Sequence, residues 1–296
     1  MRSVSLTAAA LALGLLPTGL AAADIVLKPS DDALQYAFSG NLGGRTQGFT
    51  FSAPASSGFD YRDSMLLFRF RSGQGGDGDT FPSVNTPTDY TFTGAKLTVY
   101  HDIGTYSWDP TTSLDGENQP FRFEVFGMGF GPVYTDATWT QNSAFSGSNS
   151  PAAPPNSPEA PRDPYPLNID SGAVQQNVTN VIGNANVTPW GTASYNPSDY
   201  TPNVAVATAF PVTFTLDVSN ARVRSYIQEG LANNSLNFVV SSVSFAAVFP
   251  TPPGNAYPRW VLNGNASPSP NPLSPRLTLE GFSTPPAAAS SWEMYH

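Results

Sequence analysis

The stretch GAKLTVY, residues 94–100, decides the fold class because its apolar and polar residues alternate strictly. Ala95, Leu97 and Val99 fall on one side of this stretch, and Lys96 and Thr98 fall on the other. Successive side chains of a β-strand point to opposite faces, so this period of two predicts a strand with one buried and one solvated face.

The same alternation recurs from one end of the chain to the other, as expected for antiparallel strands with one buried face. It is found in residues 66–71, 121–125, 212–217, 236–240 and 276–280. Only one helix is expected. Ser219 can cap it, Val223, Tyr226 and Ile227 have helical spacing, and Gly230 can end it. Many strands and one short connecting helix predict an all-β, antiparallel two-sheet sandwich.

Residues 1–23 have the three parts of a secretory signal peptide. Arg2 is the positive start, residues 4–16 are an almost unbroken apolar run, and Ala21 to Ala23 offer small residues before a cleavage site. The run is shorter than the roughly 20 residues that span a bilayer. We therefore expect a secreted protein, extracellular or at the cell surface, without a membrane span.

Charge and cysteine content exclude several classes of function. Removal of Arg2 reduces the 13 basic residues to 12 against 22 acidic ones, which gives a net charge of −10 that repels nucleic acid. The chain has no cysteine, which excludes disulfides, thiol catalysis and thiolate zinc sites. Its 29 prolines and 25 glycines are typical of a secreted β-protein with many turns.

Residues at about 148–166 are rich in Pro, Ser, Ala and Asn and are expected to form a loop or an interdomain linker. The end of the chain, residues 284–296, is expected to be a flexible tail, or to dock through Trp292 and Tyr295 on another surface.

Six segments occur in an order that resembles a known group of proteins. They are residues 65–70, 94–100, 135–140, 216–219 with the helix that follows, 236–241 and 275–280. This order resembles the DNRLRE-type secreted β-sandwich modules, a jelly-roll group with carbohydrate-binding members. The resemblance implies a jelly-roll sandwich over residues 24–283 as one domain, with the Pro-rich stretch as a long loop. The regions after Tyr100 and before Val212 are longer and richer in proline than in such modules.

Residues suited to catalysis are few. The chain has only two histidines, His101 and His296, which leaves His101 as the sole triad candidate and excludes a multi-histidine zinc site. We expect His101 at a strand rim or in a loop. Glu124 and Glu280 alternate with core positions and could serve a glycosidase only as a pair in one cleft, whereas Asp217 is expected to be a turn or capping acid. The protein is therefore not expected to be an enzyme.

Two carboxylates occur on a flexible loop, in residues 76–79. Asp77 and Asp79 could offer oxygen ligands to a structural calcium ion, although the spacing matches no complete EF-hand. The alternative is a solvated Gly-rich turn. Calcium is the one cofactor that the sequence suggests.

Aromatic residues in loops suggest carbohydrate binding. Tyr106, Trp108, Trp190, Tyr195 and Tyr200 lie in stretches rich in Ser, Thr, Asn and Pro. Aromatic faces beside hydroxyl and amide groups suit sugar rings, although the same rings could instead pack as a satellite core. Polysaccharide is therefore the expected partner. The alternatives are a structural subunit that assembles with copies of itself or with other surface proteins, and a polysaccharide-active hydrolase or lyase.

Overall fold

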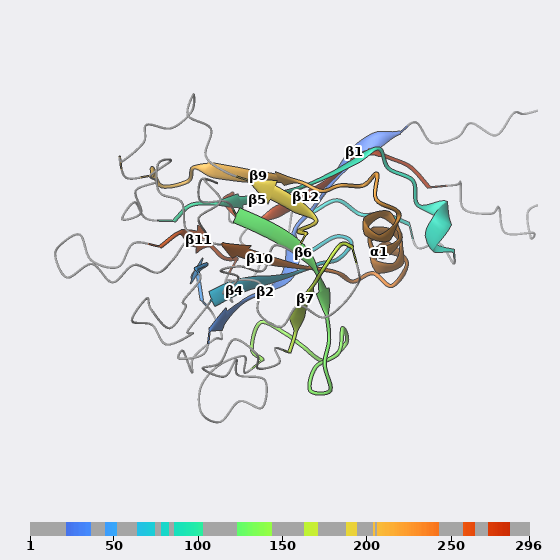
Figure 1. Ribbon diagram of the computed structural model, residues 1–296. Coiled ribbons are helices and arrows are strands. Elements are labelled where there is room, and N and C mark those ends of the chain that lie inside the picture. Colours follow the sequence, from blue (N-terminus) through green and yellow to red (C-terminus); the bar gives the residue numbers. More distant parts are fainter. Residues whose placement is uncertain are drawn as a thin grey trace, which may run out of the picture.

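The computed structural model describes residues 22–36, 45–51, 64–74, 78–82, 86–102, 123–143, 163–170, 188–193, 204, 206–242, 257–263 and 272–284. In this part of the chain the strands form two stacked layers, with one helix at the end of the stack (Figure 1). No helix within these ranges is long and apolar enough to cross a membrane.

The first layer is a four-stranded antiparallel sheet in the order β1-β12-β5-β9. Its strands are β1 (Ala23–Leu27), β12 (Arg276–Phe282), β5 (Gly94–Tyr100) and β9 (Pro211–Thr215). Buried and more exposed residues alternate strictly along β5 and β9, because one face covers the core and the other faces outward. The prediction of half-buried strands is confirmed in this layer.

The second layer is an antiparallel sheet in the order β2-β4-β10-β6-β7, with β8 also paired to β6. Its strands are β2 (Pro29–Tyr36), β4 (Ser64–Phe70), β10 (Leu236–Ser242), β6 (Phe123–Gly129), β7 (Tyr165–Leu167) and β8 (Gly191–Ala193). A two-stranded ribbon of β3 (Gln47–Phe49) and β11 (Arg259–Val261) accompanies the sheets, and a short 3-10 turn, η2, covers Pro87–Asp89.

The expected fold class, all-β and antiparallel in two layers with one helix in the described part, is confirmed. Strands from both sides of the Pro-rich stretch pair with each other in each sheet. In the second layer β10 lies between β4 and β6, and in the first β9 pairs with β5. The jelly-roll connection remains a prediction.

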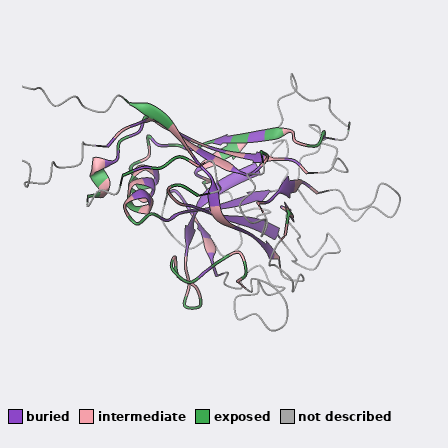
Figure 2. Ribbon diagram, turned by 180° about the vertical axis from the view of Figure 1, so that it is seen from behind, coloured by how far each residue is buried: buried purple, intermediate pink, exposed green. Residues whose placement is uncertain are grey.

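The strands at the centre of the second layer differ from the prediction, because β4, β6 and β10 are buried along their whole length (Figure 2). Their inner face is apolar, and Phe123 on that face packs against Trp260 with ring centroids 5.0 Å apart. Their outer face carries polar side chains that are nevertheless buried, namely Arg69, Glu124, Asn237 and Ser241. Alternation was therefore correct, but the expectation of a solvated face on these strands was wrong.

Arg69 shows how the outer face is stabilised. Its guanidinium lies 3.5 Å from a carboxylate oxygen of Asp31, stacks 4.4 Å from the ring centre of Trp139 and donates to the Trp139 carbonyl oxygen. Trp139 in turn donates its indole N–H to Asn237 at 3.1 Å. Since a buried charge is tolerated only when it is paired, this network explains why a charged strand residue lies inside the protein.

The helix α1 (Ala221–Ala232) begins and ends at residues other than those predicted. Asn220 is its N-cap and accepts from the Arg222 N–H, whereas Ser219 lies one residue earlier. The helix continues past Gly230 and ends in a Schellman motif, with Asn234 at a φ of 51° and a 2.8 Å hydrogen bond from the Ser235 N–H to the Gly230 carbonyl. Its buried residues, Val223, Ile227 and Leu231, face the core.

The Pro-rich stretch also ends earlier than predicted, because β7 begins at Tyr165. Just before β7 lies Asp163, a buried residue. Its carboxylate accepts from the backbone N–H groups of Gly131, Val133 and Tyr134 at 2.7–3.1 Å and so fixes the start of this strand. The rest of the stretch, and the tail from residue 285 onward, lie outside the described residues.

His101 is a core residue and not the rim residue that the sequence suggested. It is 1% exposed and packs on Trp260 with ring centroids 4.4 Å apart. Burial lowers the pKa of His101 from 6.5 to about 3, and a hydrogen bond with the backbone of Arg259 offsets part of this effect. His101 is therefore neutral in the folded protein at ordinary pH.

The free energy of unfolding is expected to fall as the pH decreases from about 6.5 toward 3. In this window the unfolded chain protonates His101 and the folded protein does not, so stability is fully present above 6.5 and decreases by at most about 5 kcal/mol. Urea unfolding of the protein and of His101→Leu over this range measures the effect. Parallel pH curves for the two proteins would show that His101 is not the group responsible.

Candidate functional site

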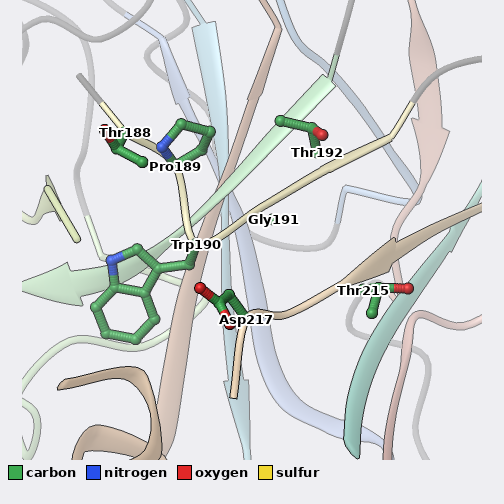
Figure 3. Close-up of a pocket in the computed structure, with 7 residues that line it drawn as sticks. All are labelled: Thr188, Pro189, Trp190, Gly191, Thr192, Thr215 and Asp217. Atoms are coloured by element: carbon green, nitrogen blue, oxygen red, sulfur yellow. The ribbon is translucent and has the colours of Figure 1, made fainter. Parts of the chain in front are cut away.

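A pocket of about 530 Å³ lies where the edges of the two sheets meet. It is formed by the residues that lead into β8 and by the end of β9, and Figure 3 shows its lining. The lining residues are Thr188, Pro189, Trp190, Gly191, Thr192, Thr215 and Asp217. β8 belongs to the second layer and β9 to the first, so the pocket requires both sheets to be in place.

Trp190 holds the two layers together at this pocket. Its backbone N–H donates to Val125 of β6 at 2.8 Å, and its carbonyl accepts from the Asp217 N–H at 2.8 Å. Its ring packs edge-to-face with Tyr226 of α1, with centroids 4.7 Å apart. Trp190 therefore links β6, α1 and the segment after β9.

Two glycines permit this close packing. A Cβ at Gly127 of β6 would overlap the six-membered ring of Trp190, and a Cβ at Gly191 would overlap the carbonyl oxygen of Thr215. A side chain at either position would therefore move Trp190 or separate β8 from β9.

Tyr226 is fixed by its hydroxyl group as well as by its ring. The hydroxyl accepts from the Met128 N–H at 3.0 Å and lies 2.6 Å from the Asn237 carbonyl oxygen, to which it donates. Burial is the main reason that the pKa of Tyr226 is raised above its usual value, so it is a structural hydroxyl and not a proton donor for chemistry.

The polar groups of the pocket are hydroxyls and one carboxylate. Thr188, Thr192, Thr215 and Asp217 are all exposed. Asp217 accepts through Oδ1 from the Ser219 N–H at 3.2 Å and from the Ser219 hydroxyl at 2.5 Å, and no described residue donates to its Oδ2. This confirms Asp217 as a turn acid and leaves one carboxylate oxygen available in the pocket.

The rim at Thr188 is fixed by residues that follow β7. The Thr188 hydroxyl donates to the carboxylate of Asp170, and its N–H donates to the side-chain oxygen of buried Asn168 at 3.3 Å. The pocket therefore has a braced rim at Thr188 and several hydroxyl groups. Such a set can hydrogen-bond a polar ligand at a pocket that is open to solvent.

Of the predicted sugar-binding residues, only Trp190 lies in the described part of the chain, and its predicted exposure was wrong. Its side chain is 1% exposed, because its ring fits over Gly127 and against Tyr226, so it offers no free face for stacking. Figure 3 shows the ring extending to one side of the pocket and the side chains of Thr192 and Thr215 on the other. Tyr106, Trp108, Tyr195 and Tyr200 lie outside the described residues.

Asp79, one of the two suggested calcium ligands, contacts the edge strand β1. Its carboxylate accepts from the Val26 N–H at 2.7 Å, and its own N–H donates to the Val26 carbonyl at 2.8 Å. Asp77 lies outside the described residues. Among described residues, no group of three or more His, Cys, Asp or Glu side chains could hold a metal ion.

The two acids considered for hydrolysis lie in different sheets. Glu124 is in β6 and is 2% exposed, which corrects the expectation of a solvated face there. Glu280 is in β12 and forms an ion pair with Lys96 of β5 at 2.5 Å. Neither acid is among the lining residues of the pocket.

Sequence reasoning missed Thr192 and Thr215 as pocket residues. They are 23 positions apart and lie on strands of different sheets, so no local pattern relates them. No protein-family model matches this chain, and no curated protein matches it.

The substitution Gly127→Ala is expected to reduce the free energy of unfolding by about 1–3 kcal/mol, because the new methyl group must displace the Trp190 ring. Gly94→Ala is the matched control at another strand position, because the atoms nearest to its Cβ belong to the side chain of Glu280, which is partly exposed and can move. Chemical denaturation of both variants checks this. Equal stability of the two would contradict the tight fit at Trp190.

Asp79→Ala is expected to reduce stability by about 1 kcal/mol and to increase self-association, because it leaves the Val26 N–H at the edge of the sheet without its acceptor. Asp89→Ala, in η2, removes the same charge without touching β1. Light scattering and size-exclusion chromatography compare the two variants. Self-association of both to the same degree would point to net charge instead of the strand edge.

Proposed function

We propose that this chain is a secreted, non-catalytic β-sandwich protein that binds polysaccharide at the cell surface or in the extracellular matrix. The observation that carries the proposal is the open pocket between β8 and β9, of about 530 Å³, whose lining includes three threonines and one carboxylate. Residues 1–23, with their signal-peptide pattern, support export.

The chemistry of the pocket suits sugar hydroxyl groups. A sugar hydroxyl can donate and accept at once, as can a threonine hydroxyl, while Asp217 Oδ2 can accept. Because Trp190, Gly127 and Gly191 hold the lining in place, little ordering free energy is lost when a ligand binds. Stacking on an aromatic face would fall to Tyr106, Trp108, Tyr195 and Tyr200, which the sequence places in loops.

The alternatives have less support. A structural subunit that docks by its N-terminal segment would need that segment free, but β1 pairs with β12 of the same chain, and Asp79 bonds its outer edge at Val26. A hydrolase would need two acids in one cleft, whereas Asp217 is the one carboxylate among the described lining residues.

Retention of the purified protein on immobilised polysaccharides, acidic and neutral, with calcium and with chelator, tests the proposal. We expect retention on at least one class of glycan, and the double substitution Thr192→Val with Thr215→Val is expected to weaken it about 10-fold, because each lost hydrogen bond contributes about 0.5–1.5 kcal/mol. Trp108→Ala separately tests the loop aromatic residues.

Thr213→Val is the matched control, because Thr213 is an exposed threonine of β9 that bonds Thr98 and does not line the pocket. Equal losses in the control and the pocket variant would place the binding surface elsewhere. Retention on no glycan at all would refute the proposal and leave the structural subunit as the leading alternative.

A further inference from the structure

We propose, on the basis of the proposed function, that this pocket selects glycan units by charge. It favours protonated amino sugars over neutral sugars, and neutral sugars over uronic acids. The observation behind this is that the one charged group among the described lining residues is the carboxylate of Asp217.

The carboxylate of Asp217 is held in a fixed position. Oδ1 accepts from the N–H and the hydroxyl of Ser219, which limits rotation of the side chain, and no described residue donates to Oδ2. Asp217 also lies three residues before Asn220, the N-cap of α1, where the helix dipole favours a negative charge. An ammonium group beside Oδ2 would gain a charge-assisted hydrogen bond, whereas a uronate would be repelled.

No lysine or arginine is among the described lining residues to balance this carboxylate. Lys96 of β5 lies opposite Thr215 in register, but its ammonium is paired with Glu280 at 2.5 Å. Arg224, on the helix that follows Asp217, donates to the carbonyl oxygens of Val218 and Phe92. Among the described lining residues, a negatively charged sugar therefore meets one carboxylate and no cation.

The net charge of the whole chain, −9, acts in the same direction over longer distances. Opposite charges a few ångströms apart at a protein surface change affinity by up to about 5-fold, and added salt weakens the effect. We therefore expect steps of this size between amino, neutral and acidic sugars at low ionic strength.

Isothermal titration calorimetry measures the affinity of the protein for three oligosaccharides of equal length. They are a glucosamine oligomer, its N-acetylated form and a uronic acid oligomer. The pH is chosen so that the amines are protonated. The expected order of affinity is amino, then N-acetylated, then uronic acid, with the differences reduced by added salt.

Asp217→Asn is expected to remove most of the difference between the three ligands, because the amide keeps the shape of the side chain and can still accept from Ser219. Glu280→Gln, which frees Lys96 opposite Thr215, is expected to improve binding of the uronic acid oligomer. Glu229→Gln on α1 is the matched control, because it removes one exposed negative charge that is not in the pocket and should leave the order unchanged.

Each outcome decides between the two proposals. Equal affinity for the three oligomers, or preference for the uronic acid, would refute charge selection while the proposed polysaccharide binding stands. An equal effect of Asp217→Asn and Glu229→Gln would also refute it, because net charge and not the pocket would then set the order. Binding of none of the oligomers, together with no retention on any polysaccharide, would refute the proposed function itself.

Discussion

The structure depends on the way Trp190 joins its two layers. One residue supplies a hydrogen bond to β6 through its N–H, another from Asp217 through its carbonyl, and an aromatic contact with Tyr226 of α1. A large buried aromatic side chain contributes several kcal/mol of hydrophobic free energy, so the position of this ring is not easily changed. The pocket depends on this junction, because its lining includes Trp190 and the residues directly before and after it, Pro189 and Gly191.

Strands β5 and β4 differ in how much of their structure the sequence could predict. In β5 the alternating pattern correctly predicted both the strand and the face that is not fully buried. In β4 the pattern is equally clear, but its polar residue Arg69 is buried by Trp139, which lies 70 positions away. The alternating period that identifies a strand is a local property of the sequence. Whether its outer face is buried depends on segments that are distant in sequence, so the strand could be inferred but the burial of that face could not.

The candidate site was predictable only in part for a related reason. Trp190 stands between Pro189 and Gly191, which indicates a turn and suggests an exposed ring. Its burial requires the missing side chain at Gly127, 63 positions earlier, and nothing near Trp190 in the sequence reveals that space. Asp217 was correctly assigned as a turn acid, because the hydrogen bonds from Ser219 involve a residue two positions away. The position of Asp217 in a pocket depends on β8, which pairs with β6 in the second layer.

The fold separates residues that hold the pocket from residues that can determine its specificity. Trp190, Gly127 and Gly191 are constrained by close contacts on all sides, so substitutions there would disturb both sheets. Thr192 in β8, Thr215 at the end of β9 and Asp217 just after β9 are instead exposed. Because their side chains bear little of the core packing, they can change with small effects on stability. The proposed ligand preference therefore rests on a few exposed hydroxyl and carboxylate groups, and their frame is fixed by the packing of one tryptophan.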